Sequence, residues 1–107
     1  MTLHHFHLDK LSQFSIHLEE QFSKLWSCQK DELPPELADE IAATAGEIML
    51  LLANHGEDEL VQGTLADARR LREAARTLQP RRAQLVETGT ALTNDVAQII
   101  RAEKRAA

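Results

Sequence analysis

The sequence predicts an all-α protein, either a four-helix up-down bundle or a helical dimer built from long amphipathic helices. Apolar side chains recur at helical spacing almost from end to end of the 107 residues. The repeat is interrupted at three places, Leu33-Pro34-Pro35, Asn54-His55-Gly56 and Leu78-Gln79-Pro80. These breaks leave four segments of similar length, each long enough to cross a small domain as one helix. None has the alternating β-branched and aromatic pattern of a strand.

The first helix is expected to begin near Asp9, whose carboxylate can cap the amides of the following turn. Residues 1–8 carry no helical stripe and are expected to form an irregular segment. The core stripe of this helix consists of Leu8, Leu11, Phe14, Leu18, Phe22, Leu25 and Trp26. Ile16 falls outside the stripe and is left for a second contact.

The second helix is expected to begin at Pro34 or Pro35, because proline is tolerated in a first turn. It should end at Asn54-His55-Gly56, where Gly56 can adopt the left-handed conformation that closes a helix. Its core stripe consists of Leu37, Ile41, Thr44, Ala45, Ile48, Leu51 and Leu52. Met49, Leu50 and Ala53 continue the apolar character around the opposite side, so this end needs cover on more than one side.

The third helix is expected to open with Glu57-Asp58-Glu59 and to continue through a weak point at Gly63. The alternative is a split at residues 63–67, with a helix stop followed by a capping box. The core stripe of this segment consists of Leu60, Val61, Leu65, Ala68, Leu71, Ala75 and Leu78.

Pro80 is expected to start the fourth helix. Its core stripe consists of Leu85, Gly89, Leu92, Val96, Ile99 and Ile100. Gly89 within this stripe would let another helix approach closely. The alternative is that Pro80 only bends one long helix, which would favour an extended or swapped dimer.

The length is that of a single domain spanning residues 1–107, in a range where helical proteins often gain stability by pairing. We therefore expect a homodimer. The lone cysteine, Cys28, cannot form an internal disulfide, and a reducing compartment is the simplest interpretation. The longest apolar run, Ile48 to Ala53, is far too short to span a membrane. The sequence thus predicts a soluble cytoplasmic protein without a membrane contact.

Charge is divided unevenly along the chain. Residues 1–60 carry three lysines against twelve acids, and residues 61–107 carry nine basic residues against five acids, so their net charges are −9 and +4. Such a split is expected if the two halves pack together or if the basic half faces an acidic partner. In an up-down bundle, Asp31 and Glu32 would lie at the same end as Arg81 and Arg82 and would offset two arginines placed unfavourably at a helix N-terminus.

Two features raise the question of nucleic-acid binding. Six arginines between residues 69 and 82 form the only basic cluster, and they are the basis of an alternative function as a nucleic-acid-associated protein. The acidic balance of the chain and the lack of aromatics among these arginines disfavour this alternative.

The stretch from Leu37 to Gly56 resembles a helix-turn-helix pattern with Gly46 at the turn. However, no lysine or arginine occurs between Lys30 and Arg69, so we interpret Gly46 as a glycine within one helix.

Histidines gather near the N-terminus, at positions 4, 5, 7 and 17, but no cysteine or carboxylate stands at a spacing that would complete a metal site. No glutamate stands three residues before any histidine, as a di-iron bundle would require. The sequence also lacks a nucleophile elbow, a phosphate-binding glycine loop and a pair of catalytic carboxylates. We therefore predict no enzyme activity, no catalytic residues, no metal site and no cofactor.

One feature of the sequence remains to be explained. The four predicted helices carry more apolar side chains than one buried face per helix can hold. This excess predicts a small non-catalytic regulator of bacterial type that binds and sequesters another protein, such as an anti-activator of a transcriptional regulator or a chaperone-like escort of an exported protein. The candidate interface consists of Ile16, Ile48, Met49, Leu50, Leu52 and Val86. The candidate contacts for an acidic partner are Arg69, Arg70, Arg72, Arg76, Arg81 and Arg82.

Overall fold

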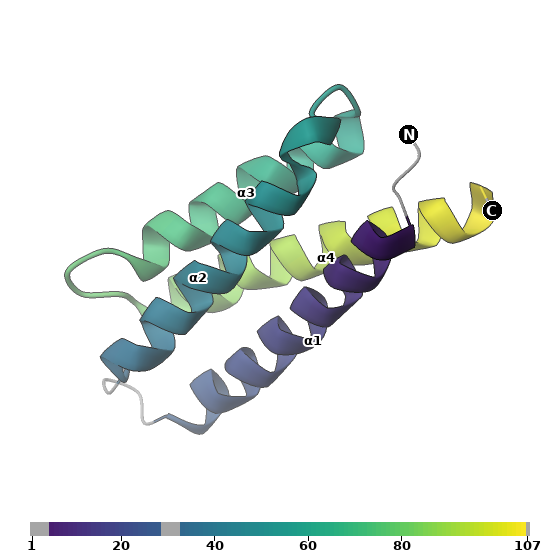
Figure 1. The fold of residues 1–107 in the computed structure, drawn as a ribbon. Helices are drawn as coiled ribbons and strands as arrows, with labels where there is room; N and C mark the ends of the chain where they lie inside the picture. The colour runs from purple at the N-terminus through teal and green to yellow at the C-terminus, as the bar shows by residue number, and fades with distance from the viewer. Residues whose placement is uncertain (1–4, 29–32, 107) are drawn as a thin grey trace.

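In a computed structural model the chain is all-α, as predicted, and the structure describes residues 5–28 and 33–106. It has four α-helices, α1 (His5–Ser27), α2 (Pro35–Leu52), α3 (Glu59–Ala75) and α4 (Arg82–Ala106), and no strand within this described part. A 3₁₀ turn, η1 (Ala53–His55), follows α2. Successive helices run in opposite directions, so α1 begins at the end of the bundle where α4 finishes (Figure 1). The molecule is elongated, with extents of 44 × 21 × 18 Å.

The helices pack in a ring in which α2 and α3, α3 and α4, α1 and α2, and α1 and α4 are neighbours. The acidic half of the chain therefore lies against the basic half along two of these contacts, which is the first of the two arrangements expected from the charge split. The largest wholly buried side chains are Leu11, Leu18, Leu25, Ile41, Ile48, Leu52, Val61, Leu71, Leu85, Leu92, Val96 and Ile99. All lie at positions expected from helical periodicity.

The start of α1 corrects the sequence-based expectation. The helix begins at His5, so Asp9 lies inside it and residues 5–8 are not irregular. Leu8 packs against the core, and the His7 ring meets the His55 ring edge-to-face with centroids 6.1 Å apart. These contacts with the core and with η1 stabilise a first turn for which the sequence carries no capping signal. Residues 1–4 lie outside the described residues.

Proline and a cap define the start of the next two helices. Pro35 opens α2, where its missing amide has no partner to lose. The Asp58 carboxylate caps α3 by accepting the amide of Leu60 at 2.8 Å and that of Val61 at 3.4 Å. α3 is continuous through Gly63, so the split alternative is wrong, and α2 is continuous through Gly46, so no helix-turn-helix exists there.

The ends of α2 and α3 differ in detail from the predictions. The chain leaves α2 through η1, and Gly56 has a φ of −66°, so it does not take the left-handed conformation. α3 stops at Ala75, before the turn that contains Leu78, and that side chain is fully exposed instead of buried. Pro80 prevents the helix from continuing past this turn, because the residue before a proline, here Gln79, disfavours helical geometry. Pro80 therefore separates two helices and does not bend one.

Hydrogen bonds join α1 to α2 across their interface. The Gln21 side-chain amide donates to the Thr44 hydroxyl at 2.9 Å and to the Glu40 carbonyl at 3.3 Å. Thr44 in turn donates to the Glu40 carbonyl at 3.0 Å, which satisfies its buried hydroxyl. The α2 side of α1 is thus closed by polar contacts near the middle of the helix.

Candidate functional site

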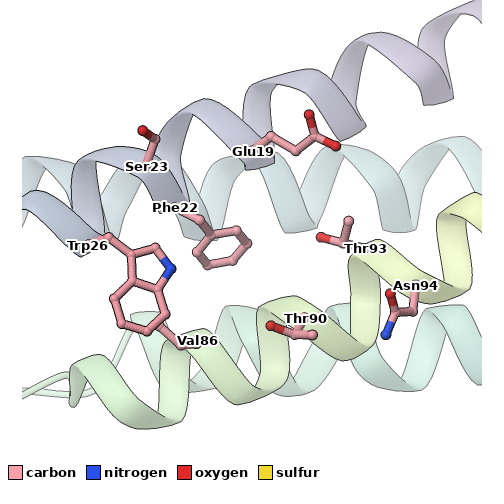
Figure 2. Close-up of a pocket in the computed structure, with 8 residues that line it drawn as sticks. All are labelled: Glu19, Phe22, Ser23, Trp26, Val86, Thr90, Thr93 and Asn94. Atoms are coloured by element: carbon pink, nitrogen blue, oxygen red, sulfur yellow. The ribbon is translucent and has the colours of Figure 1, made fainter.

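A groove runs between α1 and α4 and has a volume of about 420 Å³. Four residues of each helix line it: Glu19, Phe22, Ser23 and Trp26 of α1, and Val86, Thr90, Thr93 and Asn94 of α4. Figure 2 shows the Phe22 ring between the two helices, with Trp26 directed toward Val86 on one side of it and Thr93 on the other. The volume is in the range of sites that receive a ligand or a side-chain cluster of a partner.

The groove owes its shape to Gly89, which faces the Phe22 ring. A Cβ built at Gly89 would overlap that ring, so only glycine permits α1 and α4 to pack with Phe22 in this position. The sequence-based expectation that Gly89 allows close approach is thereby confirmed. Because the Phe22 ring occupies the space above Gly89, it forms the apolar floor of the groove.

Trp26 is the exception among the predicted core residues of α1, because 61 % of its surface is exposed. Its backbone position continues the core stripe, but it stands in the last turn of the helix, beyond the layer formed by Leu25. Leu8, Phe14 and Phe22 are half-buried and pack against the core. Assigning Trp26 to the core was therefore wrong, and its indole instead forms one wall of the groove.

Arg82 fixes the position of Trp26. Its guanidinium lies 4.8 Å from the centroid of the Trp26 ring, a cation–π contact. The same guanidinium donates to the carbonyls of Trp26 at 3.3 Å and Cys28 at 3.4 Å. Arg82 thus caps the negative end of α1, which offsets its unfavourable place at the start of α4. Asp31 and Glu32, which were expected to provide this compensation, lie outside the described residues.

The rim of the groove is polar. Thr93 donates to the Gly89 carbonyl at 2.9 Å and is satisfied by its own helix. Glu19, Ser23, Thr90 and Asn94 are exposed. One carboxylate, hydroxyls and an amide around an apolar floor can hydrogen-bond the polar flank of a polypeptide that buries its apolar side chains in the groove.

The predicted interface residues do not form one surface. Val86 lines the groove, and Ile16, 53 % exposed, stands one helical turn before Glu19 on α1. Leu50 is 74 % exposed but belongs to the end of α2 that lies far from Trp26 and Val86 in the antiparallel bundle (Figure 1). Met49 is half-buried against the core.

Ile48 and Leu52 were wrongly predicted to be interface residues. Both are wholly buried in the chain's own core, so neither can contact a partner from this folded chain. Both belong to the core stripe predicted for this helix, and the stripe is what the chain buries, whereas Leu50 outside the stripe stays exposed.

The predicted arginine cluster extends from α3 through the turn that follows it to the start of α4. Arg69, Arg72 and Arg76 follow one flank of α3 at helical spacing, while Arg70 lies on another side and meets the Asp67 carboxylate at 3.3 Å. Arg81 is exposed, and Arg82 is held against the end of α1.

A pair of carboxylates lies between α3 and α4, outside the groove. Burial, together with a hydrogen bond to Asp67 and the charge of that residue, raises the pKa of Asp95 from its ordinary 3.8 to about 7. Oδ2 of Asp95 is buried and accepts no hydrogen bond from the described part of the chain. A proton on this carboxyl group can be donated to Asp67.

Asp95→Asn should therefore stabilise the protein more at pH 8 than at pH 4. Because the folded state binds this proton more tightly than the unfolded state, the stabilisation that the proton provides is complete below about pH 4 and is lost as the pH rises through 7. The variant's gain in Tm over the wild type should grow across this range by about 4 °C or more. Thermal denaturation from pH 4 to 8 measures it, with Asp39→Asn as an exposed control. An Asp95→Asn gain that does not change with pH would contradict the assignment.

Among the described residues, no cluster of three or more His, Cys, Asp or Glu side chains could hold a metal ion. Within the same part of the chain, no helix has both the length and the apolar character needed to cross a bilayer. Comparison with protein-family models, curated proteins and solved structures found no match.

Proposed function

We propose that this chain is a small non-catalytic regulatory protein that binds and sequesters another protein, whose amphipathic helix enters the α1–α4 groove. The observation that carries the proposal is an exposed tryptophan that Arg82 contacts and that stands beside an apolar floor. Trp26 keeps 61 % of its surface exposed while Arg82 fixes its ring from one side. Tryptophan and arginine are the residue types that most often dominate binding energy at protein interfaces.

The groove suits a helix better than an extended strand. It is bounded by two helices and has no sheet edge to which a strand could add. A helix lying along it would place apolar side chains, spaced three or four residues apart, against Phe22, Trp26 and Val86. Its polar flanks would meet Thr90 and Asn94 on one side and Glu19 on the other.

Sequestration is the mode of action that such a site supports. A chain that covers the apolar face of a partner's amphipathic helix blocks the contacts which that face makes elsewhere. This suits a cytoplasmic anti-activator of a transcriptional regulator, or an escort that shields an apolar segment before export, of the kind found in bacteria. The anti-activator role is our first choice.

Trp26→Ala should reduce partner capture about 30-fold, equivalent to about 2 kcal/mol, because it removes the exposed anchor of the groove. The experiment places a photo-crosslinking amino acid at Ser23 in the tagged chain, irradiates the native cell and identifies the adduct by mass spectrometry. We expect one adduct with a protein other than this chain, lost when Trp26→Ala is combined with the crosslinker.

The matched control places the same crosslinker at Ala43, which is exposed on α2 away from the groove. Circular dichroism should show Trp26→Ala to be folded, because most of the side chain is already in solvent. A foreign adduct that forms equally from Ala43, or that survives Trp26→Ala, would contradict binding in the groove.

A further inference from the structure

We propose that in the free protein a second copy of this chain occupies the α1–α4 groove, forming a two-fold homodimer that must separate before a partner helix can bind. The regulatory part of this inference rests on the proposed function. The dimer itself does not, because it follows from the shape and the charge of the groove alone.

The register of α1 against α4 is known from the contacts that build the groove. Trp26 stands level with Arg82 and Val86, Phe22 with Gly89, and Glu19 with Thr93 and Asn94. Because both helices rise by about 1.5 Å per residue, the same antiparallel register continues toward the other end of the bundle. It places Ile16 level with Ala97.

A two-fold axis parallel to the helices keeps this register between two copies. Rotation about such an axis lays α1 of one protomer over α4 of the other, again antiparallel and at the same height. Trp26 then meets Val86 across the interface, Glu19 meets the amide of Asn94, and Ile16 meets the small side chain of Ala97. Two exposed apolar side chains of α1, Ile16 at 53 % and Trp26 at 61 %, are covered in each copy.

Charge selects this arrangement over the other two-fold pairing of the same face. α1 exposes two adjacent carboxylates, Glu19, which lines the groove, and Glu20. The alternative axis, perpendicular to the helices, would place α1 on α1 and bring these carboxylates toward their own copies, which is unfavourable. From Val86 to Arg101 the exposed side chains of α4 are Glu87, Thr90, Asn94, Gln98 and Arg101. In the parallel-axis pairing Glu87 of one protomer lies level with the exposed Lys24 of the other, and Glu19 lies level with the neutral Asn94.

The consequence for function is competition. A partner helix and the second protomer need the same groove, so partner affinity is lowered by the fraction of chain held as dimer. The homodimer would store the protein in a form with Ile16 and Trp26 covered, and a partner would convert it into a heterodimer.

The test uses the purified full chain in analytical ultracentrifugation over a range of concentrations. The chain has a mass of 12.0 kDa, and we expect a species of twice that mass. Ser23→Arg, which inserts a long cation into the groove from an exposed position, should raise the dimer Kd at least about tenfold. Leu50→Glu, at the exposed far end of α2, is the matched control and should leave the Kd unchanged.

Disulfide trapping checks the geometry. One protein carries Ile16→Cys and the other Ala97→Cys, both in a Cys28→Ser background, and an inter-chain disulfide should form when the two are mixed. A monomer at every concentration, a dimer weakened by Leu50→Glu and not by Ser23→Arg, or an Ile16→Cys protein that crosslinks only to itself would overturn the inference. None of these results affects the Ser23 crosslink to a foreign protein, so the dimer and the proposed function can fail separately.

Discussion

Ile48→Ala is expected to lower the free energy of unfolding by about 2–5 kcal/mol, whereas Leu50→Ala two residues later should change it by less than about 0.5 kcal/mol. Ile48 is wholly buried in the core, so its truncation removes apolar packing and leaves a cavity. Leu50 is 74 % exposed and gives up little on truncation. Both residues were part of the interface predicted from sequence, and the structure separates their roles.

Urea denaturation monitored by circular dichroism measures the difference, with equal slopes in the two variants showing that the unfolded state is unchanged. A loss of total stability is a realistic outcome for Ile48→Ala, since a domain of this size has only about 5–15 kcal/mol in all. If Ile48→Ala does not fold, Ile48→Val tests the same position, and it should lower the free energy of unfolding by about 1 kcal/mol. If Leu50→Ala cost as much as Ile48→Ala, the exposed end of α2 would have to be covered in solution.

The helix order could be predicted because the signals that set it are local. Prolines at 35 and 80 and the Asp58 cap act within one turn of the chain, and the core stripes depend only on spacing. The error at the start of α1 arises because a distant segment determines where that helix begins. The first turn of α1 depends on Leu8 and on the contact between His7 and His55, which lie 48 residues apart in the sequence. No local sequence pattern indicates the contact between His7 and His55.

The groove was harder to predict than the fold. Val86 was predicted as an interface residue and Gly89 as a point of close approach, but only the packing of α1 on α4 brings them to Phe22 and Trp26. The spacing of apolar residues shows which face of a helix is apolar. It does not show how much of the length of that face a neighbouring helix covers. For this reason Trp26 was assigned to the core. Thr90, Thr93 and Asn94 border the groove, and no pattern in the sequence indicated this.

Gly89→Ala should destabilise the protein by about 1–2 kcal/mol, although the same change in most exposed helices is stabilising by about 1 kcal/mol. The reason is the Phe22 ring, which occupies the place that the new methyl group needs. The ring must swing out of its half-buried position, and the packing energy that it gives up there exceeds the gain in helix propensity. We expect a fall in Tm of about 4–8 °C for each kcal/mol of stability removed.

The sign of the effect should reverse once the ring is gone. In a Phe22→Ala background the methyl group at position 89 meets no side chain, so Gly89→Ala should raise stability by up to about 1 kcal/mol. A double-mutant cycle on Gly89→Ala and Phe22→Ala would then show a coupling of about 2–3 kcal/mol between two helices that meet only in the folded chain. Gly63→Ala is the matched control, because no atom within 4 Å opposes a Cβ there and the change should be stabilising in both backgrounds. Gly89→Ala that stabilises with Phe22 present would mean that the ring does not rest on Gly89, and the groove would then lack the floor on which partner binding and dimerisation both depend.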